Sequence, residues 1–217
     1  MKEQIYSIDK PFPETIAVGG KSYRLNLSFD RVIRFYELMR DRESAFSDEE
    51  RLEIAYAWLV KRPRRAKRAE KIAVIRAVME TRLTLTERTL PQKRKERTAI
   101  GYIEDSPYLY AAFRQVYGID LFRERGKLHW WKFLAMLDSL PPDCKLKEIM
   151  AIRTRELPKF NGRNAEEIDR IREQQQYYFL DVNFEEAEAE ANDGANRLFE
   201  ALLLKAKEGE AYGGKRG

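Results

Sequence analysis

Residues 127–140, KLHWWKFLAMLDSL, constrain the fold more than any other stretch of this chain. Successive residues of an α-helix lie about 100° apart around its axis. One stripe of the predicted helix then collects five apolar residues: Trp130, Phe133, Leu134, Leu137 and Leu140. Trp131 lies off that stripe, near Leu128 and Ala135. A helix that is apolar around most of its circumference is either central to a domain or exposes an apolar side to a partner.

The two adjacent tryptophans therefore have two interpretations. They are core residues, or they belong to a partner-binding surface whose candidate residues are Leu128, Trp130 and Trp131. Trp131 is the better candidate for a partner anchor, because it lies off the main stripe. His129, the only histidine, has no second histidine and no nearby cysteine to form a metal site, and no placed nucleophile. We expect it to be a surface or hydrogen-bonded structural residue.

Residues 14–27, ETIAVGGKSYRLNL, predict a β-hairpin. A two-residue turn at Gly19-Gly20 pairs Val18 with Lys21 and Ile16 with Tyr23, which fits a type I′ connection. This register collects the larger apolar side chains on one face: Ile16, Val18, Tyr23, Leu25 and Leu27. A lone hairpin is marginally stable in water, so this face must pack against helices.

The next segments have the periodicity of amphipathic helices. The first helix begins at Ser28 or Asp30, and its apolar stripe is Phe29, Val32, Ile33, Tyr36 and Met39. A second begins at Ser47, where Glu50 completes a capping-box pattern, and ends or kinks at Pro63. Its inward residues are Leu52, Ala55, Tyr56 and Leu59. A third covers residues 64–85, with the stripe Ile72, Ile75, Val78, Met79 and Leu83. Residues 86–106 have no sustained period and predict a linker or exposed loop.

Further helices follow at 107–117, which ends at Gly118, and at 127–140. Another begins at Asp143 and carries Leu146, Ile149, Met150 and Leu157. From about residue 165 the pattern is acidic and helical, with a last stripe that is interrupted at 192–194: Phe184, Ala187, Ala191, Leu198 and Leu202. These elements predict a mainly α fold, a multi-helix domain with a small N-terminal β-hairpin. We expect a helical core domain over 12–157, an acidic helical extension over 158–208 and a disordered tail over 209–217.

The composition indicates a solvated helical protein. Charged residues make up 35% of the chain, with a formal net charge of +5. No apolar run approaches the ~18 to 20 residues that span a bilayer, and the N-terminal residues do not look like a signal peptide. Cys144 is the only cysteine, which excludes an internal disulfide and a cysteine-based metal cluster. We expect a cytosolic protein without cofactor, metal site, catalytic residues or membrane contact, and not an enzyme.

Charge is distributed unevenly along the chain. Residues 61–97 hold 14 Lys and Arg against 4 Asp and Glu, a local charge of +10, whereas residues 164–217 hold 13 acidic and 7 basic residues, a local charge of −6. The cations at 61–71, KRPRRAKRAEK, could neutralise phosphates through Arg64, Arg65, Lys67 and Arg68. Against this, the segment lacks interleaved aromatic residues and a recognised groove-reading motif. A helix start that meets an acidic partner, or the acidic end of this chain, explains the charges equally well.

Two stretches resemble the bacteriophage gp-fifteen family of tail-gene-region proteins. They are YAAFRQVYGIDL at 110–121, followed by GKLHWWKFLAMLDSLPPDCKLKEIMAIRTREL at 126–157, and the hairpin that leads into LNLSFDRVIRFYEL at 25–38. The resemblance covers residues 12–157 and is most specific at YGIDL and LHWWKF. The basic stretch at 61–71 is heavier than the family pattern, and the part after residue 158 has no recognisable family motif.

The resemblance implies a phage tail assembly chaperone. Such a protein binds the tape measure protein, helps to recruit tail tube subunits, acts in the host cell cytoplasm and is absent from the mature virion. It has no catalytic residues to transfer, and it could form homo-oligomers. Two alternatives stay open: a structural virion protein of the tail or connector, and a basic module that binds nucleic acid through residues 61–97.

Overall fold

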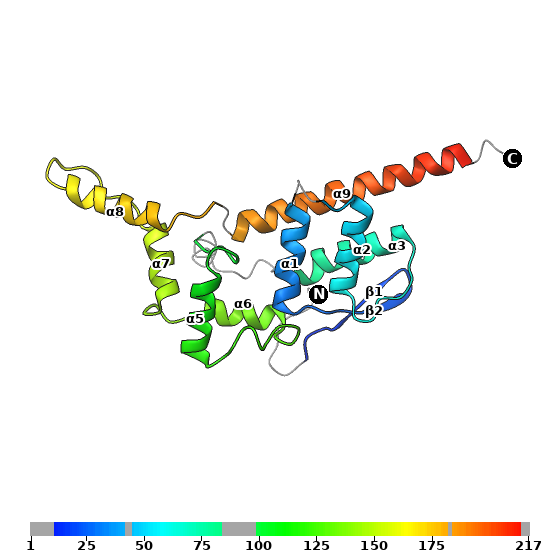
Figure 1. The fold of residues 1–217 in the computed structure, drawn as a ribbon, viewed down its shortest axis with the longest axis horizontal. Coiled ribbons are helices and arrows are strands. Elements are labelled where there is room, and N and C mark those ends of the chain that lie inside the picture. Colours follow the sequence, from blue (N-terminus) through cyan, green and yellow to red (C-terminus); the bar gives the residue numbers. More distant parts are fainter. Residues whose placement is uncertain (1–10, 42–44, 84–98, 182–183, 214–217) are drawn as a thin grey trace, which may run out of the picture. The chain divides into compact units, whose positions relative to one another are not determined.

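The computed structural model describes residues 11–41, 45–83, 99–181 and 184–213. The predicted fold class is confirmed, because helices dominate and the only described sheet is a two-stranded antiparallel hairpin near the N-terminus (Figure 1). The chain divides into two compact units. Unit 1 comprises residues 1–84 and 190–217, and unit 2 comprises residues 85–189.

The hairpin has the predicted register. Strand β1, Thr15–Val18, pairs with β2, Lys21–Arg24, so that Ile16 faces Tyr23 and Val18 faces Lys21. Gly19 and Gly20 both have positive φ, 57° and 73°, which side chains with a Cβ rarely adopt. A further bridge joins Leu25 to Val60, flanked by hydrogen bonds from Asn26 N to Leu59 O and from Lys61 N to Arg24 O. The hairpin is thereby tied to the chain that follows the second helix.

Helices α1, Phe29–Arg40, and α2, Asp48–Leu59, pack against each other in unit 1. The predicted capping box is present, with the Ser47 side chain accepting from Glu50 N and the Glu50 carboxylate accepting from Ser47 N. All four predicted inward residues of α2 are buried. In α1, Phe35 and Leu38 are buried beyond the predicted stripe, whereas Ile33 is half-buried. The buried arc is wider because α1 also meets the C-terminal helix.

Helix α3, Arg68–Val78, begins four residues later than predicted and continues as a π-helical segment, Met79–Leu83. Residues 61–67 are not helical. Pro63 and the repulsion between positive charges and the positive end of the helix dipole explain the delay. The predicted stripe of α3 is buried, together with Val74.

Of the predicted loop at 86–106, residues 86–98 lie outside the described residues. The expectation of an exposed loop is wrong for Ala99, Ile100, Tyr102 and Asp105, which are buried.

Helix α9, Phe184–Gly213, is the largest departure from the predicted organisation. It is continuous through residues 192–194, and its residues from 190 onward belong to unit 1, where Leu198, Phe199 and Leu202 are buried. A Cβ built on Gly194 would lie 1.9 Å from the Met39 carbonyl oxygen, so the α9 and α1 backbones meet directly. Residues 190–208 of the expected acidic extension therefore belong to unit 1, whereas residues 158–189 belong to unit 2. The expected disordered tail is helical up to Gly213, and 214–217 lie outside the described residues.

Unit 2 contains α5, Ser106–Tyr117, α6, Trp130–Asp138, α7, Lys145–Thr154, and α8, Ala165–Tyr177. Gly118 ends α5 in the left-handed conformation, as predicted. Helix α6 begins three residues later than predicted, because His129 is its N-cap and accepts a hydrogen bond at Nδ1 from Trp131 N. Cys144, and not Asp143, precedes α7, and the predicted inward residue Leu157 is 42% exposed beyond the end of that helix.

Aromatic rings fill the centre of unit 2. The Phe133 ring of α6 stacks on Phe113 of α5, with centroids 5.2 Å apart, and on Trp130, with centroids 5.7 Å apart. Tyr102 meets the edge of the Trp130 ring at 5.7 Å. The segment before α5 therefore contributes to the core, which explains why it is buried.

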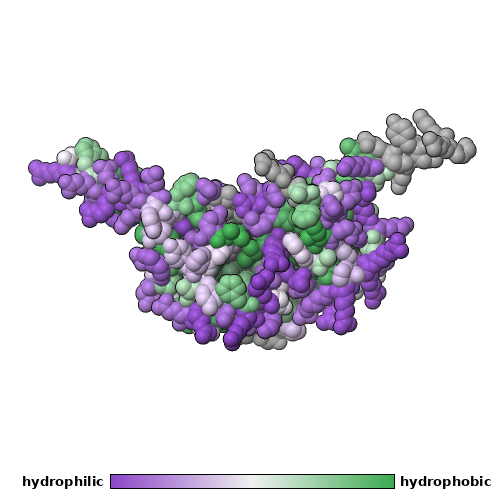
Figure 2. Space-filling model, viewed as in Figure 1, coloured by the Kyte–Doolittle hydropathy of each residue, from purple (hydrophilic) through white to green (hydrophobic). Residues whose placement is uncertain are grey.

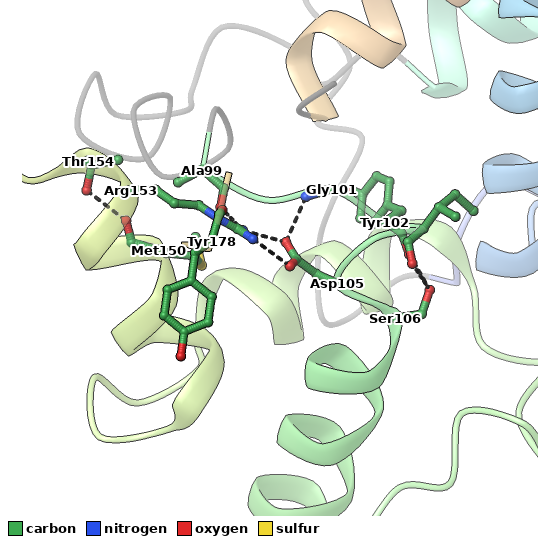
Figure 3. A network of polar contacts seen from close by, with 10 residues as sticks. Ala99, Gly101, Tyr102, Asp105, Ser106, Met150, Arg153, Thr154 and Tyr178 are labelled. Atoms are coloured by element: carbon green, nitrogen blue, oxygen red, sulfur yellow. Dashed lines mark hydrogen bonds and ion pairs between the residues drawn. The ribbon is translucent and has the colours of Figure 1, made fainter. Parts of the chain in front are cut away.

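A buried ion pair joins three parts of unit 2 (Figure 3). The Arg153 guanidinium of α7 donates to both carboxylate oxygens of Asp105, at 2.7 and 2.9 Å. It also donates to the carbonyl oxygens of Ala99 and Tyr178, and Gly101 N donates to the Asp105 carboxylate. The pair therefore fixes the segment before α5, the end of α7 and the chain that leaves α8.

Candidate interaction surfaces

The first candidate surface is the exposed chain between α2 and α3. Residues 62–67, RPRRAK, which we call the basic segment, run from the bridge at Val60 to the start of α3. Before it, Lys61 N donates to Arg24 O at 2.7 Å. After it, α3 packs on β1, and Glu70 accepts hydrogen bonds from Lys21 and Tyr23 of β2. Both ends of the basic segment are therefore anchored to the hairpin.

The cations that flank the basic segment are paired within unit 1. Lys61 lies 3.1 Å from the Glu14 carboxylate, Arg68 lies 3.4 Å from Glu49, and Lys71 pairs with Glu53. The hydrogen bond from Lys61 lowers the pKa of Glu14. Hydrogen bonds from Lys21 and Tyr23 likewise lower the pKa of Glu70. The nearby carboxylates are thus already engaged in ion pairs with other cations.

The basic segment itself keeps four unneutralised charges. Arg62, Arg64, Arg65 and Lys67 are exposed, and no acidic side chain of the described residues forms an ion pair with them. The structure therefore brings together three of the four cations named from the sequence. The fourth, Arg68, differs, because it pairs with Glu49 and donates to the Leu202 carbonyl oxygen of α9 at 3.5 Å.

The second group named from the sequence lies inside unit 2. Leu128, Trp130 and Trp131 have exposed fractions of 8%, 0% and 4%. Such side chains reach a partner only if the unit opens. Burial therefore favours the interpretation of both tryptophans as core residues, and a partner-binding role for these three residues stays a prediction.

Unit 2 has exposed apolar side chains at other positions, and three aromatic ones lie in or next to α8. Phe160 precedes this helix, Tyr177 ends it and Phe179 follows it, and they are 69%, 80% and 70% exposed. We call these three residues the α8 aromatics. Figure 2 shows small hydrophobic areas within the largely hydrophilic surface of this region. The sequence pattern missed them as a surface. In the structure, Ile168 and Ile171 are the only buried residues of α8, so most of this helix is exposed.

The α8 aromatics stand on a well-anchored backbone. Gln175 Nε2 donates to the carbonyl oxygens of Ile152 and Arg155, at 3.1 and 2.7 Å, and Arg153 donates to Tyr178 O. The end of α8 is thereby fixed to the end of α7. Tyr177 and Phe179 are thus solvent-exposed side chains on a backbone that is held in place.

The described residues offer no further candidate site in their cavity, their possible metal ligands or their apolar helices. A cavity of about 350 Å³ in unit 1 is lined by both apolar and charged residues, among them Met39, Asp48, Arg51 and Leu198. Its Arg51 is occupied by hydrogen bonds to the carbonyl oxygens of Leu38 and Met39. Within the described ranges, no group of three or more His, Cys, Asp or Glu side chains could hold a metal ion. None of the helices there is long and apolar enough to cross a membrane.

These observations define a class: a mainly α-helical protein whose described surface offers a basic segment and exposed aromatic residues for contacts with other molecules. A family model described as "Bacteriophage Gp15 protein" matches residues 8–180. The chain belongs to this bacteriophage protein family, as the YGIDL and LHWWKF motifs predict. The match includes α8, beyond the end of the predicted resemblance at residue 157. Comparisons with curated proteins and with solved structures find no match.

Proposed function

We propose that the chain is a phage tail assembly chaperone, a non-enzymatic protein that binds the tape measure protein and helps to recruit tail tube subunits. The family match over residues 8–180 carries the proposal. It supports a role in building the phage particle, and the tail-gene resemblance of the two motif stretches narrows that role to the tail. The chaperone acts in the host cell cytoplasm and leaves before the virion is complete.

The α8 aromatics supply the contact that such a role needs. A long helical client exposes apolar residues at i, i+3, i+4 and i+7, and it aggregates unless these are covered. Phe160, Tyr177 and Phe179 offer exposed rings to such a stripe. Exposed charged residues of α8 lie between Phe160 and Tyr177 in the chain, among them Glu166, Arg170 and Glu173. These charges keep the free surface soluble and match a client whose flanks are charged.

The same geometry suits a reversible contact. Three rings bury only a small area, which favours weak and exchangeable binding over a permanent interface. The α7–α8 hydrogen bonds hold the backbone of Tyr177 and Phe179 before the client arrives, so less conformational entropy is lost on binding. Several copies along one tape measure protein would add their contacts, and tube subunits could displace them one by one.

The test is co-expression of this chain with the tape measure protein of the same phage, followed by affinity capture and size-exclusion chromatography. We expect the tape measure protein to become soluble and to co-elute with many copies of the chain. The variant F160S/Y177S/F179S should lose this effect while keeping its own helical content. A matched control, I103S/F122S/L204S, removes three other exposed apolar side chains (53%, 70% and 59% exposed) and should retain it.

Three results would contradict the proposal. The client could stay insoluble with the unaltered chain, or the control could fail as badly as the α8 variant. The chain could also be found as a stoichiometric part of purified mature tails, which would favour the alternative of a structural virion protein.

A further inference from the structure

We propose that the basic segment binds the phosphate backbone of nucleic acid without sequence preference. The proposal is independent of the tail chaperone role and uses a different part of the chain. It rests on three features of residues 62–67: their unneutralised charge, their anchored ends and the chemistry of their side chains.

The positive charge of the basic segment is not neutralised by the acidic side chains near it. The nearby carboxylates are each paired with a cation outside the basic segment. The pairs are Glu14 with Lys61, Glu49 with Arg68, Glu53 with Lys71 and Glu70 with Lys21. Arg62, Arg64, Arg65 and Lys67 form no ion pair with any described acidic residue. Four positive charges within six residues are therefore exposed to solvent and free for an external anion.

The backbone presents these charges in a fixed place. The hydrogen bond from Lys61 N to Arg24 O holds one end, and the contact of Glu70 with Lys21 and Tyr23 holds the other. Between them the chain is not helical, so successive side chains leave it in different directions. A short segment held at both ends loses little freedom when it meets a rod-like polyanion.

The side chains fit phosphate better than the carboxylates of an acidic protein. The neutral members of the segment are Pro63 and Ala66, so it lacks a large apolar anchor. A contact made only of charge is weak with isolated carboxylates, because water and salt screen exposed ion pairs. It is stronger with nucleic acid, where closely spaced phosphates hold condensed counterions that are released on binding. Three of the four cations are arginines, whose planar forks bind phosphate oxygens in pairs.

The same composition predicts the absence of sequence preference. The basic segment has no aromatic ring on which bases could stack, and it is not a helix that could enter the major groove. Contact is therefore with the backbone alone. Duplex DNA should bind somewhat better than a single strand, because its charge density is higher.

The first measurement is fluorescence anisotropy of the full chain with a labelled 20-base-pair duplex and a 20-nucleotide single strand, in salt from 50 to 200 mM. The variant R62Q/R64Q/R65Q/K67Q should reduce the magnitude of the log Kobs–log salt slope by about 3.6 on the duplex and about 2.8 on the single strand, if each cation neutralises one phosphate. At four contacts, duplex affinity falls roughly 150-fold across this salt range.

A matched control separates the basic segment from net charge. R34Q/R125Q/K159Q/R163Q also removes four exposed cations, but from scattered positions. It should leave the salt slope nearly unchanged. The double variant R64Q/R65Q should lower the magnitude of the duplex slope by about 1.8, which keeps the proposal testable if the quadruple variant folds poorly. The melting temperature of each variant reports its folding.

Three outcomes would overturn the proposal. The unaltered chain could show no salt-dependent binding to either DNA. The scattered control could lose as much affinity as the quadruple variant, which would assign the effect to net charge. Polyglutamate or anionic vesicles, compared at equal salt, could bind the basic segment more tightly than DNA, which would assign it to an acidic protein or a membrane surface.

Discussion

At the scale of single residues, Gly194 shows how one position can reverse a prediction. Asn192-Asp193-Gly194 consists of poor helix formers, so the sequence predicts an interruption. In the structure α9 passes through, and the missing side chain of Gly194 lets its backbone meet the Met39 carbonyl oxygen. The sequence shows the low helix propensity of this glycine but not the helix that packs against it.

We expect Gly194→Ala to destabilise unit 1. The added Cβ would lie 1.9 Å from a backbone oxygen, which cannot rotate away, so α9 must shift. Such overpacking costs about 1 to 3 kcal/mol, more than the helix propensity of ~1 kcal/mol that alanine gains over glycine. Urea denaturation measures the difference. Asn196→Ala, an exposed change in the same helix, should be neutral or slightly stabilising, and equal effects of the two changes would argue against the close approach.

Asp105 is a second residue whose role depends on a distant partner. It lies in a stretch without periodicity that predicts an exposed loop, yet its side chain is 1% exposed and paired with Arg153. Asp105→Ala leaves the guanidinium buried without its carboxylate, which costs about 3 to 5 kcal/mol of unfolding free energy. Asp169→Ala breaks the exposed pair with Arg172 and should cost at most about 1 kcal/mol. Similar melting temperatures for the two variants would show that the buried pair is not a structural centre of unit 2.

At the scale of elements, the sequence predicted best where the signals are local. The Gly-Gly turn, the Ser47–Glu50 capping box and the Gly118 helix end depend on neighbours within a few residues, and all three are confirmed. Helix starts were less accurate at α3 and α6. The start of α3 is delayed by Pro63 and nearby positive charge. The start of α6 is set by the His129 N-cap, although the apolar residue Leu128 precedes it.

The difference between α6 and α8 leads to a paired prediction. Trp131 of α6 is 4% exposed, whereas Phe179 beyond α8 is 70% exposed. Truncating a buried tryptophan costs about 3 to 5 kcal/mol. We therefore expect Trp131→Ala to lower the urea midpoint strongly and Phe179→Ala to leave it nearly unchanged. A stable Trp131→Ala protein that failed to capture the tape measure protein would instead restore Trp131 as a partner anchor.

At the scale of the whole molecule, the chain order conceals the division into units. The sequence suggested a core over 12–157 followed by an extension, because charge and the family resemblance both change near residue 158. In the structure, the last helix belongs to unit 1 from residue 190 onward, and its Leu198, Phe199 and Leu202 are buried there. The two candidate surfaces differ in the same way. The basic segment could be predicted from a local run of charge, whereas the exposure of the α8 aromatics depends on which side of α8 packs.

The division predicts that truncation after Ala189 will affect unit 1 selectively. Losing three buried apolar side chains of α9 removes roughly 5 to 9 kcal/mol, at about 1.5 to 3 kcal/mol each. This is comparable with the 5 to 15 kcal/mol that stabilises a typical domain, so unit 1 should be largely unfolded. In a Trp58→Phe background, the remaining fluorescence comes from Trp130 and Trp131 and reports unit 2 alone. We expect its thermal midpoint to match that of the full chain, while the helical circular dichroism is already reduced at room temperature. An undiminished circular dichroism signal per residue would mean that α9 is dispensable to unit 1, contrary to its buried face.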